Sequence, residues 1–231
     1  MPLVFLLHYL FVGAKRFIHG GKRIYFFTLF NRITHWVAAV AFVVLIPTGL
    51  MMVFGKYLGG GEPIRIAREL HGYFTLLFIV SVIPMFVSWF RAMIISFDDI
   101  KWAFMAGGYL SKKKIEVPAG KFNAGQKFWY WVATLGGFVM IFTGAAMYFQ
   151  NFDFGIASSL HMTQIDLLRL SAIIHNALGF IVLAMFLTHI YMSVFAIKGS
   201  LNSMIDGYKE EDEVAHMHSS YYKKLKKEGK I

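Results

Sequence analysis

Four long apolar runs constrain the fold of this chain more than any other feature. Each is close to or above the ~20 apolar residues that an α-helix needs to cross a bilayer. The runs are Ile33 to Phe54, Gly72 to Phe90, Phe128 to Phe149 and Leu170 to Phe195. Charged residues make up only 16% of the chain, whereas a soluble domain carries about 25%. The sequence therefore predicts an all-α membrane protein, a bundle of four transmembrane helices.

The second and fourth helices are expected to begin before their apolar runs. Glu62 and the proline after it suit the first turn of a helix, and Thr163 to Asp166 has the T-x-x-D pattern of a capping box. Pro47 and Pro84 lie inside the first two runs. Membrane helices tolerate such prolines where neighbouring helices satisfy the freed carbonyl groups.

The distribution of basic residues predicts which ends of the helices face the cytoplasm. The N-terminal arm, the connection between the second and third runs, and the C-terminal tail together hold 18 Lys and Arg residues, against 4 in the other two connections. Under the positive-inside rule, this places both termini in the cytoplasm. Because the basic residues are spread over several segments, they do not indicate nucleic-acid binding.

The first residues contain a short apolar stretch of their own. Leu3 to Val12 would extend only about 15 Å as a helix, which is too short to cross a membrane, and no basic segment precedes it as in a signal peptide. We expect an interfacial helix, or a segment packed on a partner's helix. The chain then divides into an N-terminal interfacial arm (1–32), a transmembrane domain (33–197) and a cytoplasmic tail (198–231).

Four of the nine histidines lie in or at the ends of the predicted membrane helices. They are His35, His71, His175 and His189. With both termini inside, His71 and His175 fall near the outer surface, whereas His35 and His189 fall near the inner surface. Each level thus holds histidines from two different helices.

The two histidines of the last run have a spacing that suits metal ligation at two depths. His175 and His189 are fourteen residues apart, which places them within about 40° of one helix face and about 21 Å apart along the axis. Two axial imidazoles are a usual way to hold haem iron. The pattern predicts two b haems, with His71 and His175 as iron ligands of the outer haem and His35 and His189 as iron ligands of the inner one. Isolated structural histidines and a proton path remain alternatives.

Two further features bear on this hypothesis. The chain has no cysteine, which excludes disulfides, iron–sulfur clusters of its own and covalently attached c-type haem. Gly49 is fourteen residues after His35, and Gly179 lies one turn after His175. These glycines would leave room for a haem, although for the glycines alone ordinary small-residue packing between helices is the preferred explanation.

Local patterns around these histidines match those of a known family. They are Arg32-Ile-Thr-His-Trp36, Glu69-Leu-His-Gly72, Lys121-Phe-Asn-Ala-Gly-Gln-Lys127, and Ile174-His-Asn together with Thr188-His-Ile-Tyr-Met192. From about residue 22 to its end, the chain resembles the membrane cytochrome b (gamma) subunit of respiratory formate dehydrogenases. It departs from that family in its first twenty residues, which are extra, and in the sequence of its tail.

The resemblance implies the same haem ligands and adds a quinone site. Menaquinone or ubiquinone would be reduced near His189, at a site formed by Asn123, Gly125 and Gln126; a turn with a helix cap is the alternative for these three residues. The chain would be the electron-transfer and quinone-reducing subunit of an enzyme in the bacterial inner membrane. It would take electrons from an iron–sulfur subunit, while a molybdenum- or tungsten-cofactor subunit oxidises formate. The same role in a hydrogenase or another oxidoreductase complex, and a haem-free histidine-containing transporter, remain alternatives.

Two smaller patterns have an open interpretation. Arg65 and Arg68 precede the second run and could meet haem propionates, an acidic partner or surface carboxylates. His216 and His218 form an H-x-H pattern in the charged tail. A metal site is possible there, but we expect a solvated or partner-facing segment.

Overall fold

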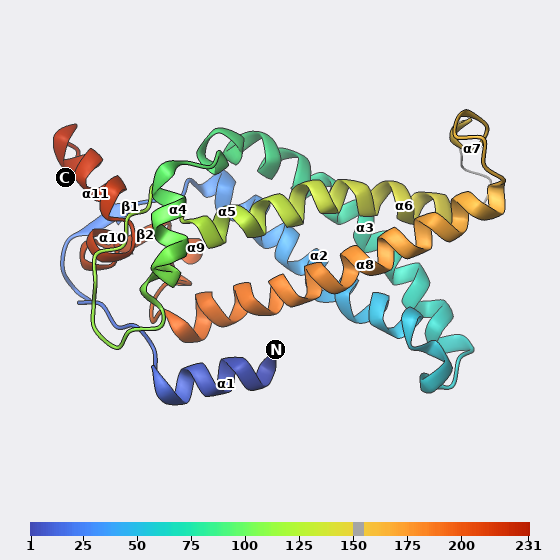
Figure 1. Cartoon of the computed structure of the whole chain (residues 1–231), viewed down its shortest axis with the longest axis horizontal. Coiled ribbons are helices and arrows are strands. Elements are labelled where there is room, and N and C mark those ends of the chain that lie inside the picture. Colours follow the sequence, from blue (N-terminus) through green and yellow to red (C-terminus); the bar gives the residue numbers. More distant parts are fainter. Residues whose placement is uncertain (150–154) are drawn as a thin grey trace. The chain divides into compact units, whose positions relative to one another are not determined.

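A computed structural model describes residues 1–149 and 155–231 of the chain (Figure 1). In chain order, the elements are α1 (Pro2–Phe11), β1 (Arg23–Tyr25), α2 (Leu29–Val53), η1 (Gly55–Leu58), α3 (Glu62–Trp89), η2 (Phe90–Met93), α4 (Phe97–Phe104), η3 (Ala106–Gly108), α5 (Ala124–Trp131), η4 (Val132–Gly136), α6 (Gly137–Phe149), α7 (Ile156–Ser159), α8 (Gln164–Ile190), η5 (Tyr191–Ala196), α9 (Asn202–Ile205), β2 (Tyr208–Glu210), α10 (Glu211–Met217) and α11 (Ser219–Lys227). They form two compact units. The first comprises Met1–Ile33, Val87–Tyr130 and Met185–Ile231, and the second comprises Thr34–Phe86 and Trp131–Ala184.

The predicted membrane-spanning helices are confirmed. Four helices of the described residues are long and apolar enough to cross a membrane: Leu29–Val53, Glu62–Met93, Ala124–Phe149 and Gln164–Ala196. The early starts are also confirmed, since α3 begins at Glu62 and α8 begins at Gln164. The Thr163 hydroxyl accepts a hydrogen bond from the backbone N–H of Asp166 at 3.2 Å and caps α8.

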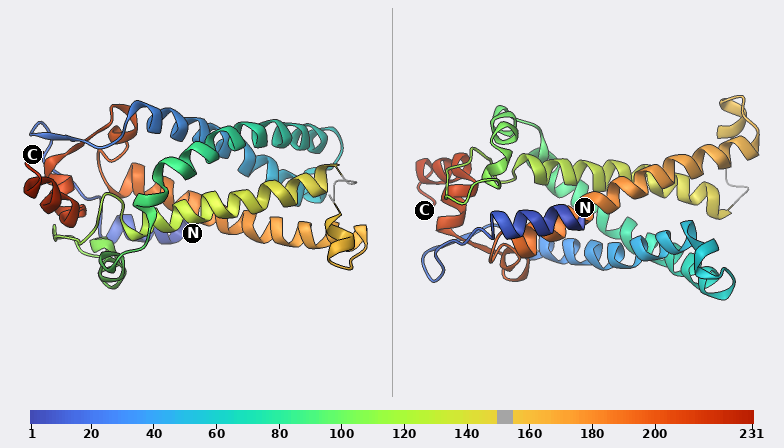
Figure 2. Two further views of the ribbon diagram at one scale, coloured as in Figure 1. Left: turned by 90° about the horizontal axis from the view of Figure 1, so that it is seen from above. Right: turned by 60° about the horizontal axis from the view of Figure 1, so that its bottom comes forward.

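The second unit is a bundle of α2, α3, α6 and α8. Figure 2 shows α6 running beside α8, and α2 beside α3, in both of its views. Ala41, Phe78 and Val82 form the buried centre of this unit. Gly137 is needed there, because a Cβ atom at this position would lie 2.7 Å from the Phe78 ring. Large apolar side chains face outward, among them Val80 and Phe142, each 69% exposed, as expected where lipid is the solvent.

The first unit is built from the N-terminal arm, the connection before α5 and the C-terminal tail. Strands β1 and β2 form an antiparallel pair in which Arg23 lies opposite Glu210. The backbone N–H of Val117 bonds to the carbonyl of His216 at 2.7 Å, and the N–H of Tyr221 bonds to the carbonyl of Ala119 at 3.1 Å. The tail is therefore paired with both the arm and the connection, and it does not extend freely into solvent.

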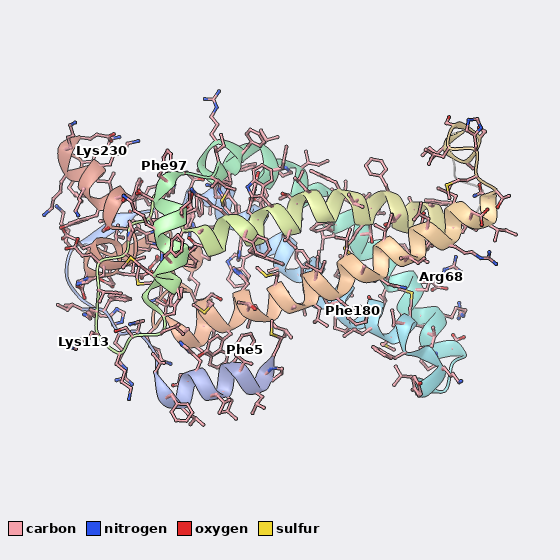
Figure 3. All side chains as sticks on the ribbon, viewed as in Figure 1. Phe5, Arg68, Phe97, Lys113, Phe180 and Lys230 are labelled. Carbon is pink, nitrogen blue, oxygen red and sulfur yellow. The ribbon has the colours of Figure 1, made fainter. Side chains whose placement is uncertain are left out.

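The apolar N-terminal stretch forms α1, which is attached to the first unit on one side. Phe5, labelled in Figure 3, stacks on Tyr191 with ring centroids 4.6 Å apart. The Nε2–H of His8 donates to the carbonyl of Tyr109 at 3.0 Å, which leaves Nδ1 to accept from the hydroxyl of Tyr191 at 2.5 Å. On its other side α1 exposes apolar residues, including Leu10 at 68%, which suits an interfacial helix.

The expectation of a solvated H-x-H segment is wrong for His218. Its side chain is buried, and its Nδ1–H donates to the carbonyl of Gly120 at 2.9 Å. Burial, together with the nearby Lys209 ammonium, lowers the pKa of His218 to about 3. Lys209 itself forms a buried ion pair with Glu213. The tail folds over the connection at residues 117–121, and this contact buries the three side chains. The charged sequence of the tail did not indicate that they would be buried.

A second buried ion pair joins α4 to the first turn of α5. The ammonium of Lys127 lies 2.6 Å from the Asp99 carboxylate, with both side chains only 6% exposed, and it also donates to the carbonyl of Ile94 at 2.9 Å. The same carboxylate caps α4, since it accepts the backbone N–H of Ser96 at 2.6 Å.

Breaking this pair is expected to destabilise the first unit strongly. Lys127→Met leaves a buried carboxylate without its cation, which costs about 3–5 kcal/mol. The double variant Asp99→Asn, Lys127→Met removes both charges and should recover part of the loss. Thermal unfolding of the purified variants in detergent measures the loss of stability in Lys127→Met and its recovery in the double variant. A Lys127→Met protein as stable as the wild type would show that the pair contributes nothing to stability.

Candidate functional site

A cavity of about 580 Å³ lies within the second unit, between α2, α3, α6 and α8. This volume falls in the range of about 300–1,000 Å³ that cofactor and ligand sites have. Most of its lining is apolar, including Leu45, Phe78, Met140 and Leu183. The cavity therefore suits a large, mainly apolar group with a few polar attachment points.

Two imidazoles enter this cavity from facing helices. His71 on α3 and His175 on α8 both line it, and their ring centroids lie 6.2 Å apart. A metal–imidazole bond is about 2 Å long; two such bonds, extended to the ring centres, require a separation of about 6 Å. The rings are thus at the distance that a single iron between them needs.

A threonine fixes the orientation of each ring. The Thr48 hydroxyl donates to the carbonyl of Val44 at 2.7 Å, and its oxygen accepts Nδ1–H of His71 at 2.9 Å. The Thr143 hydroxyl lies 3.0 Å from the Nδ1 of His175 in the same way. With Nδ1 protonated, the lone pair of each neutral imidazole is on Nε2, the atom that would bind iron.

Glycines leave space beside both rings. A Cβ atom on Gly49 would lie 3.4 Å from the Cε1 of His71, and one on Gly144 would lie 3.2 Å from the Cε1 of His175. Gly179 also lines the cavity. Any larger residue at Gly144 would therefore press on the His175 ring.

Three of these residues were not identified from the sequence: Thr48, Thr143 and Gly144. A signal for them exists, because the dipeptide Thr-Gly occurs once in the first predicted helix and once in the third. The threonine of each dipeptide orients a histidine, and the glycine after it makes room for the same ring.

The other two predicted ligands lie in different units. His35 on α2 belongs to the second unit, where its ring meets that of Trp36 edge-on at 5.6 Å. His189, at the end of α8, belongs to the first unit and stacks on Trp129 of α5 with ring centroids 5.7 Å apart.

The predicted quinone-site residues form the start of α5, in the same unit as His189. Asn123 and Gln126 make a reciprocal capping box: the Asn123 Oδ1 accepts the N–H of Gln126 at 2.9 Å, and the Gln126 Oε1 accepts the N–H of Asn123 at 3.0 Å. Asn123 and Gln126 thus form the helix cap that was the alternative interpretation of these residues. Trp129, one turn beyond Gln126, carries the contact to His189.

The capping box uses only the oxygens of the two side-chain amides. The NH₂ group of Asn123 faces the buried hydroxyl of Tyr109, whereas that of Gln126 has no protein acceptor among the described residues. Gly125 makes room for an indole, because a Cβ atom there would lie 3.1 Å from the Trp102 ring. Gln126 therefore keeps a donor for a ligand.

Comparison with known proteins agrees with this geometry. Residues 27–207 match the family model described as prokaryotic cytochrome b561. The chain is 28% identical over 196 residues to the formate dehydrogenase cytochrome b556 subunit of Haemophilus influenzae, covering 83% of this chain and 79% of that protein. It is 28% identical over 202 residues to the cytochrome b556(Fdn) subunit of the nitrate-inducible formate dehydrogenase of Escherichia coli K12, covering 85% and 89%. The chain belongs to the prokaryotic cytochrome b561 family.

Proposed function

We propose that this chain is the membrane cytochrome b subunit of a quinone-linked formate dehydrogenase complex. The observation that carries the proposal is the apolar cavity with two imidazoles 6.2 Å apart, each oriented by a threonine. The names of the relatives, which are cytochrome b556 subunits of formate dehydrogenases, supply the identity of the complex.

In this proposal residues 33–197 form a dihaem domain. His71 and His175 hold the outer haem b, and His35 and His189 hold the inner one. Two b haems at these depths would carry electrons from one side of the membrane to the other. The protein contributes the ligands, the apolar surroundings and the neutral tautomer of each imidazole.

The quinone binds at the start of α5, close to His189. Gln126 donates from its amide to a quinone carbonyl, while Asn123 and Gly125 shape the same turn. The stacking of Trp129 on His189 supports this placement, because Trp129 and Gln126 lie one helical turn apart. A site at the cytoplasmic end can take the two protons of quinone reduction from water.

The partners in this proposal are those that the resemblance to formate dehydrogenase subunits implies. An iron–sulfur subunit on the outer side delivers electrons, and a catalytic subunit with a molybdenum or tungsten cofactor oxidises formate. The multi-pass chain lies in the bacterial inner membrane with both termini in the cytoplasm; α1 in the arm (1–32) lies at the interface with lipid, and the tail (198–231) is cytoplasmic.

Two other functions are weighed against this one. A hydrogenase or another oxidoreductase could use the same dihaem subunit, and copurification of the catalytic partner separates these cases. A haem-free transporter would also place histidines in membrane helices, but it has no need for two rings at the spacing of one iron.

A haem count tests the proposal directly. We expect a dithionite-reduced minus oxidised spectrum of the purified chain to show b-type bands, and a pyridine haemochrome assay to find about two haems per chain. A folded preparation without haem would contradict the proposed function and favour the transporter.

A further inference from the structure

Arg68 has an unusual position among the residues that line the cavity. It is the one Lys, Arg, Asp or Glu among the lining residues that the structure describes, and it is exposed, so it lies at the rim. It sits on α3 three residues before His71 and therefore on nearly the same face of that helix. The cavity thus has two imidazole rings in its lining and one permanent cation at its edge.

The side chain of Arg68 is held in place by Tyr148 of α6. Its guanidinium carbon lies 5.0 Å from the centre of the Tyr148 ring, and its Nη2 donates to the Tyr148 carbonyl at 3.2 Å. Tyr148 also lines the cavity and fits closely against α3, since a Cβ atom on Gly72 would lie 3.2 Å from its ring. These contacts use the ring face and one N–H, which leaves most donors of the guanidinium available.

Arg65, one turn earlier on the same helix, is a contrasting case. Its guanidinium forms ion pairs with Glu62 and, at 2.8 Å, with Glu69, and it does not line the cavity. Arg68 has no carboxylate partner among the described residues. The two arginines have the same charge and lie one turn apart on α3. Arg65 is neutralised by carboxylates at the surface, whereas Arg68 lies at the rim of the cavity without a carboxylate partner among the described residues.

We propose that Arg68 binds the propionate carboxylates of the haem held by His71 and His175. This inference rests on the proposed function and names the residue that sets the rotation of the outer haem about its iron axis. Arg and carboxylate form strong, paired hydrogen bonds, and Tyr148 holds the guanidinium ready for them. Because Arg68 lies before the apolar run of α3, this contact would place the propionates toward the polar surface and leave the apolar lining of the cavity to the rest of the haem.

The test compares Arg68→Gln with Arg65→Gln in the full-length protein purified in detergent. Two quantities are measured: the midpoint potential of each haem by redox titration, and the rate at which haem transfers to excess apomyoglobin. Arg68→Gln should lower the potential of one haem, because a nearby cation disfavours the oxidised iron, which carries one more positive charge. It should also lose that haem about tenfold to hundredfold faster, as the loss of a charged hydrogen bond predicts.

Control variants separate the charge of Arg68 from its geometry. Arg68→Lys keeps the charge but not the paired hydrogen bonds, so the potential should stay near that of the wild type while haem loss quickens. Tyr148→Leu should shift both quantities in the direction of Arg68→Gln, though less. Arg65→Gln should change neither.

The outcomes distinguish this inference from the proposed function. Two haems in the wild type, with Arg68→Gln indistinguishable from Arg65→Gln, would overturn the role of Arg68 and leave the function standing. A wild type without haem would overturn both. If Arg68→Gln fails to fold, the Arg68→Lys and Tyr148→Leu proteins decide, and unchanged haem loss in both would overturn the inference.

Discussion

Replacing His71 with alanine is expected to halve the haem content of the purified protein, from about two haems to about one. The imidazole of His71 is one of the two that line the cavity with their centroids 6.2 Å apart, and its loss would leave the outer iron with His175 alone. The helices should still form, because the core of this unit consists of Ala41, Phe78 and Val82, with no part played by the ring. The pyridine haemochrome assay and the reduced spectrum measure the loss.

The matched control for His71→Ala is Thr48→Val, which keeps the ligand and removes the hydroxyl that orients it. Hydrogen-bond partners that orient a metal ligand typically contribute tenfold to a hundredfold in affinity, so Thr48→Val should retain haem at a saturating supply and release it faster. His161→Ala, outside the cavity, should retain both haems. An intact count of two in His71→Ala would contradict the assignment of this ligand.

Much of this fold could be predicted because its signals are local. Length and hydropathy indicated the four spans, and the capping pattern at Thr163 located the start of α8 to the residue. Pro47 and Pro84 lie inside α2 and α3, as expected for prolines that membrane helices tolerate. Each of these features depends on one segment and its own chemistry.

The candidate site was predictable only in part. Residue type and depth singled out His71 and His175, and fourteen-residue spacing singled out Gly49, which the structure places beside the His71 ring. Thr143 and Gly144 escaped notice because their role depends on which helix packs against α8. The spacing of residues along one helix carries no information about its neighbour.

The tail shows where reasoning from composition fails. His218 was expected in a solvated or partner-facing segment, yet it is buried, and so are Lys209 and Glu213 of the same charged tail. Their burial follows from pairing with residues about a hundred or more positions earlier, such as the strand at Arg23–Tyr25 and the carbonyl of Gly120. A buried ion pair is tolerated because each charge has its partner. Lys209 and Glu213 are partners only four residues apart, but that spacing does not indicate that the pair is buried.

Replacing the side-chain amide of Gln126 is expected to separate helix capping from quinone binding at the start of α5. Gln126→Glu keeps a side-chain oxygen for the N–H of Asn123, so the capping box and the helix should remain. It replaces the NH₂ donor with a carboxylate oxygen, which cannot donate to a quinone carbonyl and repels it. We expect quinone reduction to slow by about tenfold to hundredfold, which corresponds to one lost hydrogen bond and the added repulsion, while dithionite still reduces two haems.

Asn123→Asp is the matched control, because it also preserves the capping oxygen. The Asn123 amide faces Tyr109, so this variant should affect the rate less than Gln126→Glu does. Gln126→Ala removes both the capping oxygen and the NH₂ donor. It should therefore lower thermal stability as well as the rate of quinone reduction. The measurement is the steady-state reduction of a menaquinone analogue by the complex with formate as donor. If Gln126→Glu reduces quinone at the wild-type rate with both haems present, the start of α5 is a helix cap alone, and the quinone site must be sought elsewhere around His189.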